Sequence, residues 1–522
     1  MRLRMFIVVA LISSLFVTPA ISASNPKEGK KCPAVGFEQE YKSRKFVCVK
    51  VSKKLQWKDA SKIKPNELPN TKGLYDFSKT YSTDGGYLDD FIGGPCSLDP
   101  NVPKEWADME AFIKNLWGCA GQVRVAKYTL GNLRPKTNLN NVNEFNNLSK
   151  CKISVSNDSK GLSHGFNSWR EEKKYPSPNS VIQLIPIYGS DTEKPKNSPK
   201  QDYGKYLEFI REWIDISSDF GSKAEIRIPT EYIEFNGKVA DYDLSHPVNH
   251  NTPGHVRFNN DVIAAVDSVI NFSGANIGIV VAPPGTDASI MEQAALGSFQ
   301  TNEGKVPVAL SQFADLPKNP KGSEYSGLSH PFWWIHEMYH AGFGLDDHYG
   351  DTKNNINSDY GMGWWTMMVP WGGDLSAWEK WILGFIKDSQ VQCVETSVPT
   401  LHWIAPSSVN TKESKLVVIP ISTTKVVVIE SIRPAGLYYK IPQSAAGVLV
   451  YEIDLSIDKH GYGMKLSLPK NRIVSNWEFS SPMFLGGALL KTSYSDYTVS
   501  NGYKISVVEA GTFGDVVKVE KI

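Results

Sequence analysis

The chain has 522 residues, with 56 lysines and arginines against 55 aspartates and glutamates, so its net charge at pH 7 is +1. Nothing in this total argues for nucleic acid or an anionic membrane as a partner of the chain. Hydrophobic residues make up 41% of the sequence. The length suffices for roughly two or three domains, each with a core of its own.

The N-terminus has the three parts of a secretory signal peptide. Two arginines precede an apolar run from Met5 to Val17, and small residues follow up to Ser24. We therefore predict a signal peptide over residues 1–23, cleaved after Ser22 or Ala23, with an uncleaved signal anchor as the alternative. No later stretch has the about 18 uninterrupted apolar residues of a membrane span, so we expect a secreted, extracellular protein.

The next residues predict a small basic module over 24–62, followed by a proline-containing linker over 63–73. Strand-like alternation covers residues 45–51. Cys32 and Cys48 bracket a short hairpin-like segment and are the best candidates for a disulfide, because a module this short cannot build a full core. A cysteine zinc site is the poorer interpretation, because no Cys-x-x-Cys spacing occurs. The module's lysines are candidates for contact with a cell wall or acidic polymer, although such runs are more often only solvated.

A larger domain is predicted over residues 74–390, with helices and strands in mixed order. Apolar residues at helical spacing predict helices at 106–117, 203–218 and 260–269. Apolar runs predict buried strands at 180–188, 225–228 and 275–283. We therefore expect a sheet with helices ahead of residue 330.

The most informative segment is residues 336–340, which read HEMYH and match the pattern HExxH. On a helix, residues four apart share one face with a rise of about 6 Å, so both imidazoles can bind one tetrahedral Zn²⁺. Glu337 lies beside them, where its carboxylate can act as general base toward a metal-activated water. Pro331 and the apolar residues 332–335 fit a helix buried beneath a cleft. The structural alternative is a buried amphipathic helix with two incidental histidines.

A catalytic zinc site needs a third protein ligand and an open position. Gly342 and Gly344 can end the helix and turn the chain back toward the metal. Within reach of that turn lie Asp346, Asp347 and His348, and the residues alone leave the choice among them open.

The other histidines receive a structural interpretation. One group, His246, His250 and His255, forms a cluster with irregular spacing in the sequence. Because prolines at 247 and 253 interrupt any helix there, we favour a solvent-exposed loop over a second metal site. The isolated residues His164, His402 and His460 are expected to be structural or surface residues.

The region after residue 361 predicts a methionine turn, a helix and then strands. Met367 or Met368 fits a hydrophobic floor beneath the metal ligands, and ordinary core packing is the alternative. A helix is predicted over 374–385, capped by Asp374 and ended by Gly384. Short strands are predicted at 415–421, 425–430, 447–453, 503–508 and 515–519. Because no helices separate them, we expect an antiparallel β domain over 391–522, built as a sandwich.

Three segments carry a resemblance to one protein family. They read HEMYHAGFGLDDHY, WTMMVPWGGDLSAWEKWILGFI, and KVVVIESIRPAG with GVLVYEID. They resemble the immune inhibitor A-like secreted metallopeptidases, a zincin group related to the metzincins, over about residues 74–460. The resemblance implies an α+β fold, in which a zincin-type catalytic domain with a mixed sheet and an active-site helix precedes the β domain. It also implies zinc-dependent endopeptidase activity on extracellular proteins.

The resemblance further implies roles for single residues. In that family HExxH is followed by Gly-Leu-x-Asp, which matches residues 344–347 and makes Asp347 the third ligand beside His336 and His340, with Glu337 as the base. This chain has one additional residue between His340 and the glycine. Candidates for stabilising the oxyanion are Tyr349 and Tyr360. Structural Ca²⁺ is a further expectation, although no EF-hand-like loop is present.

Two other functions are open at this point. One is a catalytically silent, secreted surface-binding protein that keeps a zincin scaffold. The other is a zinc hydrolase that acts on a glycan rather than a peptide. The carboxylate of Glu337 argues against the first, because a scaffold without turnover has no chemical need of it.

Overall fold

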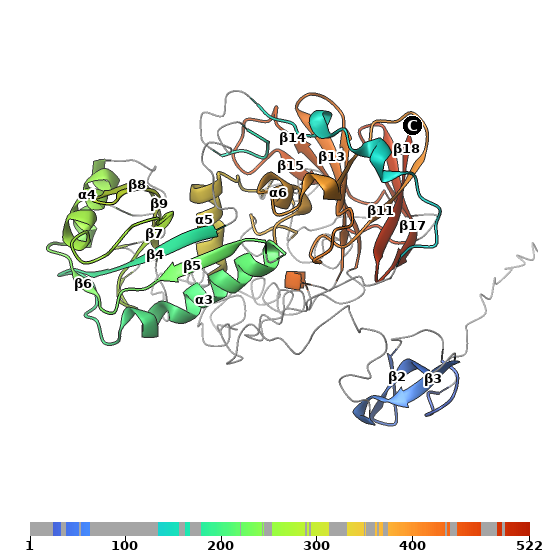
Figure 1. Cartoon of the computed structure of the whole chain (residues 1–522), viewed down its shortest axis with the longest axis horizontal. Helices are drawn as coiled ribbons and strands as arrows, with labels where there is room; N and C mark the ends of the chain where they lie inside the picture. The colour runs from blue at the N-terminus through green and yellow to red at the C-terminus, as the bar shows by residue number, and fades with distance from the viewer. Residues whose placement is uncertain are drawn as a thin grey trace, which may run out of the picture. The chain divides into compact units, whose positions relative to one another are not determined.

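The computed structural model describes most of residues 25–62 and 134–522 (Figure 1). The longer segments outside the description are 1–24, 63–133, 168–178, 313–330, 351–360 and 471–487. The predicted signal peptide, linker and helix at 106–117 therefore lie outside the described residues. The chain divides into two compact units, Met1–Lys72 and Gly73–Ile522, and each is described by itself. Among the described helices, none combines the length and the apolar character that a membrane crossing requires.

The N-terminal unit contains a three-stranded antiparallel sheet in the order β1-β2-β3. Its strands are β1 (Glu38–Tyr41), β2 (Arg44–Val51) and β3 (Lys54–Asp59), and β2 confirms the predicted strand. The buried cluster comprises Cys32, Phe46 and Trp57. A core this small agrees with the need for a covalent link. Cys32 is disulfide-bonded, but the side chain of Cys48 is not described, so the predicted pairing stays a prediction.

A six-stranded mixed sheet forms the first part of the larger unit. It consists of β4 (Asn179–Tyr188), β5 (Lys223–Arg227), β6 (Ile233–Glu234), β7 (Ile277–Val281), β8 (Ala294–Thr301) and β9 (Gly304–Gln312). The order is β5-β4-β7-β9-β8, with β6 paired to β4. All pairs are parallel except β8 with β9, so β8 is an antiparallel edge strand. The sequence predicts β4, β5 and β7 but not β8 and β9, which pair with register shifts on both sides of Gly297.

Helices cover both faces of this sheet, as Figure 1 shows. They are α3 (Pro199–Ser217), α4 (Pro253–Val266) and α5 (Pro331–Phe343). Along β4, Leu184 belongs to the hydrophobic cluster shared with α3 and α5, whereas its neighbour Ile185 belongs to the cluster shared with α4. This alternation follows from the two-residue period of a strand. The sheet is therefore buried on both sides, and α5 lies under β8 and β9.

The C-terminal part of the unit has two further sheets. One has the order β10-β12-β13-β14-β15 and the other β11-β18-β17-β16. The strands are β10 (Val391–Cys393), β11 (Thr400–Ile404), β12 (Leu416–Pro420), β13 (Lys425–Ile432), β14 (Gly447–Asp454), β15 (Met464–Leu466), β16 (Tyr497–Ser500), β17 (Tyr503–Gly511) and β18 (Gly514–Lys521). Pairing is antiparallel throughout, except that β10 and β12 are parallel. All five predicted strands are confirmed within a few residues.

The five-stranded sheet joins the two halves of the larger unit. On β13, Val427 and Ile429 pack in a cluster with the four-stranded sheet, while Val426 and Val428 pack in the cluster that contains Trp334 of α5. Burial of both faces explains why β13 is an almost continuous apolar run rather than an alternating one. One hydrophobic core thus extends across residue 390. The described chain is a mixed α and β protein with large sheets and few helices.

The helix after the methionine turn is shorter than expected. It is α6 (Ala377–Ile382), and its cap is Ser376 rather than the predicted Asp374. Ser376 and Glu379 form a reciprocal capping box, which satisfies two backbone N–H groups at the helix start. Asp374 instead forms a buried ion pair with Lys380. Gly384 has the left-handed conformation (φ 74°) expected of a residue that ends a helix.

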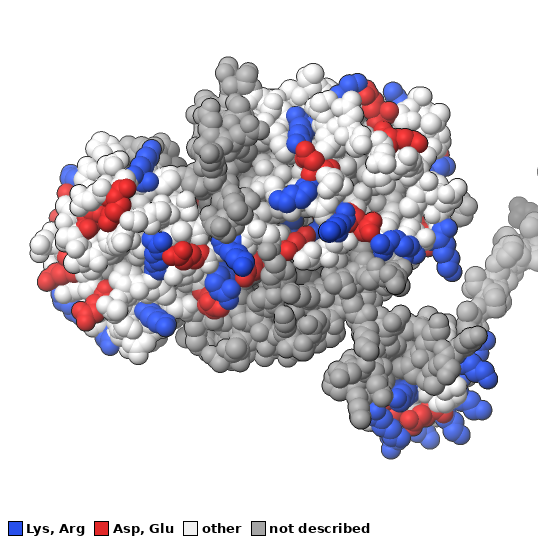
Figure 2. Space-filling model, in the orientation of Figure 1, with Lys and Arg blue, Asp and Glu red and all other residues white. Residues whose placement is uncertain are grey.

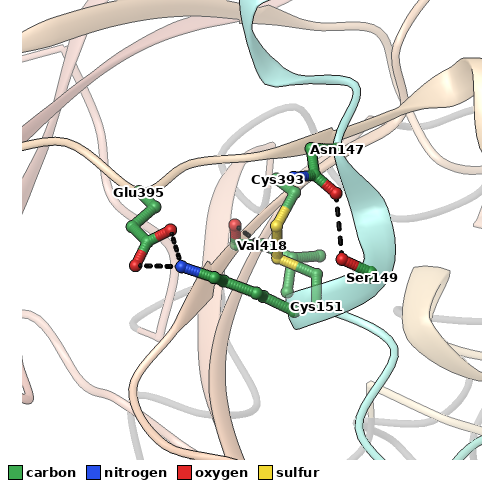
Figure 3. The surroundings of a disulfide bond; sticks show 7 residues. Asn147, Ser149, Cys151, Cys393, Glu395 and Val418 are labelled. Atoms are coloured by element: carbon green, nitrogen blue, oxygen red, sulfur yellow. Dashed lines mark hydrogen bonds and ion pairs between the residues drawn. A yellow bond between two sulfur atoms is a disulfide. The ribbon is translucent and has the colours of Figure 1, made fainter.

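A disulfide between Cys151 and Cys393 links segments that are 242 residues apart (Figure 3). Cys151 follows the short 3₁₀ helix Leu148–Lys150, and Cys393 lies on β10. Beside the bond, Lys150 forms an ion pair of 2.6 Å with Glu395. Residue spacing alone cannot find such a pair, because it depends on the folded path of the whole unit.

We expect loss of this disulfide to destabilise the larger unit. The double substitution Cys151→Ser with Cys393→Ser should lower the free energy of unfolding by about 2–5 kcal/mol, because the bond closes a long loop and restricts the unfolded chain. Denaturant unfolding measures the change. Lys150→Ala is the matched control, since it removes an exposed ion pair worth at most about 1 kcal/mol. Equal unfolding midpoints for the double variant and the wild type would contradict the expectation.

Candidate metal centre

Helix α5 ends in a turn that brings the following chain back to its two histidines. Gly344 adopts the left-handed conformation (φ 62°), and its N–H donates to the carbonyl of His340 at 3.0 Å. The N–H of Leu345 donates to the carbonyl of Tyr339 at 3.2 Å. Left-handed backbone favours glycine at this position because a side chain would be strained. The turn thereby brings Asp347 back to the two histidines.

Three donor atoms converge at this point. The Nε2 atoms of His336 and His340 lie 2.9 Å apart. Oδ1 of Asp347 lies 3.2 Å from the first and 3.1 Å from the second. Among the described residues, this is the one group of histidine, cysteine and acidic side chains whose atoms could together hold a metal ion. His336 and Asp347 are buried, and His340 is partly buried.

The orientation of both imidazoles fits a metal ligand set. Nδ1 of His336 lies 3.0 Å from the carbonyl oxygen of Met367, and Nδ1 of His340 lies 2.7 Å from that of Leu345. A carbonyl only accepts, so each Nδ1 carries a hydrogen, which leaves each Nε2 as the atom that would bind a metal ion. A tetrahedral zinc ion requires donor separations of roughly 3.3 Å, close to those observed. The residues therefore fit a bound metal ion.

The charges around the centre favour a cation. Burial raises the pKa of Asp347, but the charge of His340 and hydrogen bonds from His336, His340 and His460 outweigh burial and hold that pKa well below its usual value. Burial lowers the pKa of His340, yet Asp347 and the charge of Glu337 raise it to about 9. Glu337 is only partly buried and lies close enough to His340 for its charge to act there.

The two other candidates for the third ligand point elsewhere. Oδ1 of Asp346 lies 2.5 Å from Nδ1 of His460 and accepts from the backbone N–H of Asp347 at 2.9 Å. Nε2 of His348 lies 2.7 Å from Oε1 of Glu379, and both side chains are fully buried. Of the three residues that the sequence left open, Asp347 alone joins the histidines.

The methionine turn lies directly against the histidines. Met367 and Met368 are both fully buried. The carbonyl of Met367 is the group that orients His336, whereas the carbonyl of Met368 accepts from the N–H of His348 at 3.2 Å. Met367 therefore lies beside His336, while the hydrophobic floor predicted for Met367 or Met368 stays a prediction. Both tyrosines proposed for the oxyanion, Tyr349 and Tyr360, lie outside the described residues.

The other histidines divide into three cases. His255 is buried on α4, so the predicted exposed loop is wrong at this residue, because Pro253 begins the helix, where proline is favoured, instead of interrupting it. His246 and His250 lie outside the described residues. His164 and His402 are buried, and burial lowers the pKa of each to about 4.

His460 is the residue that sequence reasoning missed. It lies on the loop between β14 and β15. Its Nε2 atom is 2.8 Å from Oδ2 of Asp347. Its hydrogen bonds with Asp346 and Asp347 raise its pKa to about 10. The available signal was weak: a polar residue followed by glycine in a loop between strands, where functional residues are common.

Comparison with known proteins adds nothing to this geometry. No protein-family model matches the chain, and no protein with curated annotation matches it.

Proposed function

We propose that this protein is a secreted zinc-dependent endopeptidase that hydrolyses peptide bonds of extracellular proteins. The convergence of His336, His340 and Asp347, with Glu337 between the two histidines on α5, carries the proposal. Two imidazoles and one carboxylate form a donor set typical of catalytic zinc, which keeps a fourth position open. The resemblance to the immune inhibitor A-like metallopeptidases supports a zincin-type domain followed by a β-sandwich.

Each protein group has a defined task in this proposal. Zinc, when bound, polarises the scissile carbonyl and lowers the pKa of a water molecule. Glu337 accepts a proton from the attacking water and returns it to the leaving amine. The carbonyls of Met367 and Leu345 keep the two imidazoles in the tautomer that binds metal.

The arrangement of the sheet supports a peptide rather than a glycan as substrate. Strand β8 is at the edge of the six-stranded sheet, and it contacts the helix that carries the site. An edge strand can bind an extended peptide through its main-chain N–H and C=O groups, which a glycan does not match. The competing function, a silent surface-binding protein, gives no role to Glu337.

Removal of the metal is expected to abolish casein hydrolysis by the full-length secreted protein. A strong zinc chelator should reduce the rate to background, and stoichiometric Zn²⁺ should restore it, whereas Mg²⁺ should not, because nitrogen ligands suit zinc and magnesium prefers oxygen. Initial rates before and after each addition measure the effect. A rate that survives complete chelation would rule out zinc catalysis, and hydrolysis of a glycan instead of casein would favour the glycan alternative.

We also propose that the N-terminal module contacts an anionic polymer such as a cell wall. Residues 25–62 contain eleven lysines and arginines against four acidic residues, so the rest of the chain has 45 basic and 51 acidic residues. Figure 2 shows basic side chains gathered over this unit. Its acidic groups are partly neutralised, since Glu28 pairs with Lys62 at 2.9 Å and Asp59 is buried.

Charge reversal in this module should weaken polyanion binding. Lys27, Lys30 and Lys31 are exposed, and changing all three to glutamate in the full chain should reduce retention on immobilised poly(glycerol phosphate) and flatten its salt dependence. The control is the same change at the exposed residues Lys194, Lys196 and Lys200 of the larger unit. Equal loss in both variants would indicate only an effect of net charge.

A further inference from the structure

His460 connects the C-terminal half of the larger unit to the metal centre. The residue lies 113 positions after Asp347 in the sequence, on the loop between β14 (Gly447–Asp454) and β15 (Met464–Leu466). Its ring forms a bridge between two carboxylates: Nδ1 lies 2.5 Å from Oδ1 of Asp346, and Nε2 lies 2.8 Å from Oδ2 of Asp347. Both partners only accept when ionised, so both ring nitrogens act as donors.

The two oxygens of Asp347 have different partners. Oδ1 faces the Nε2 atoms of His336 and His340 at 3.2 and 3.1 Å, while Oδ2 faces His460. The contact with His460 therefore fixes the rotation of the carboxylate about its Cβ–Cγ bond. Asp346 strengthens this arrangement, because its Oδ1 also accepts from the backbone N–H of Asp347 at 2.9 Å.

The loop that carries His460 is itself held in place. The N–H of Gly350 donates to the carbonyl of Gly461 at 2.8 Å, which ties the loop to the chain just after the metal ligands. The carbonyl of Tyr462 lies 2.6 Å from Nε2 of His164. Gly463 has a left-handed φ of 99°, and a Cβ atom there would lie 2.8 Å from the His164 ring. The position of His460 is thus held by the contacts of the three residues that follow it.

We propose that His460 is a positioning residue for the metal centre, which holds Asp347 so that Oδ1 stays directed at the two imidazoles. The inference depends on the proposed function, because it assigns a partner to a ligand of the proposed zinc ion. Outer partners of metal ligands set ligand orientation and basicity. The site is then incomplete without the β14–β15 loop, although the HExxH helix and Asp347 all precede residue 390.

The test compares metal binding by the full secreted chain and three variants at this position. His460→Ala should weaken zinc affinity roughly 10- to 100-fold, the usual cost of losing an outer partner. His460→Arg should recover affinity, because a guanidinium can donate to both carboxylates and the half-exposed site leaves room for it. Chelator competition measures affinity, and the visible spectrum of the Co²⁺-loaded protein reports ligand geometry. Should His460→Ala not fold, His460→Gln, which keeps one donor, must still bind zinc more weakly than wild type.

Ile457→Ala is the matched control, since this exposed residue shares the loop and its side chain has no part in the site. Its affinity and Co²⁺ spectrum should equal those of wild type. Wild-type affinity and an unchanged spectrum in His460→Ala would overturn the inference, as would a His460→Arg variant that binds as weakly as His460→Ala. If the wild-type chain itself binds neither Zn²⁺ nor Co²⁺, the proposed function fails instead.

Discussion

Glu337→Gln is expected to abolish peptide hydrolysis while zinc stays bound. Glutamine has the same shape but cannot accept a proton, and loss of a general base typically costs about 10²- to 10⁴-fold in rate. Glu337 is not among the three converging donor atoms, so the metal should remain. The measurement is kcat/KM on a fluorogenic peptide together with zinc content per chain.

Glu225→Gln provides the comparison for this experiment. Glu225 is an exposed carboxylate on β5 that pairs with Arg227, away from the residues that form the centre. Its variant should hydrolyse the peptide at the wild-type rate. A Glu337→Gln protein that retains zinc and full activity would show that Glu337 is not the base. Loss of zinc together with activity would show that the carboxylate supports the metal instead.

Asp347→Ala is expected to remove zinc from the protein, and activity with it. The substitution takes away the single oxygen donor, so affinity should fall by more than the roughly 10- to 100-fold that loss of an outer partner costs. The neighbouring change Asp346→Ala removes only a support of His460 and Asp347, and should reduce affinity much less. Zinc content after dialysis against a weak chelator distinguishes the two.

The same pair of variants tests the choice among the three residues after the helix. If Asp346→Ala lost zinc while Asp347→Ala kept it, Asp346 rather than Asp347 would be the third metal ligand. Retention of zinc by both variants would leave His348 as the remaining candidate for the third ligand. In the structure His348 pairs with Glu379.

The sequence predicts the parts of the site that depend on local periodicity. His336 and His340 are four residues apart on an apolar helix, and this spacing alone places both imidazoles on one face. The third ligand is different. Its position depends on the turn at Gly344, whose left-handed conformation the residues permit but do not dictate. Asp347 is therefore predicted only through a family resemblance, while the contacts of Asp346 and His348 are visible only in the fold.

Contacts between residues that are far apart in the sequence could not be predicted from it. The Cys151–Cys393 bond and the contact of His460 with Asp347 each join residues more than 100 positions apart. The edge strand β8 was not predicted, and its pairing with β9 has register shifts at Gly297. The helix start at Pro253 was not predicted because proline can either begin or interrupt a helix. Strands such as β13, which are buried on both faces, are predicted well because burial makes them continuously apolar.

The most direct test of the proposed centre is the metal content of the wild-type protein, purified without added metal or chelator and measured by elemental mass spectrometry. We expect about one zinc per chain, retained through dialysis, because three donors converge in a largely buried site. A folded protein that contains no zinc, and takes up none when zinc is supplied, would contradict the assignment of His336, His340 and Asp347 as a metal site.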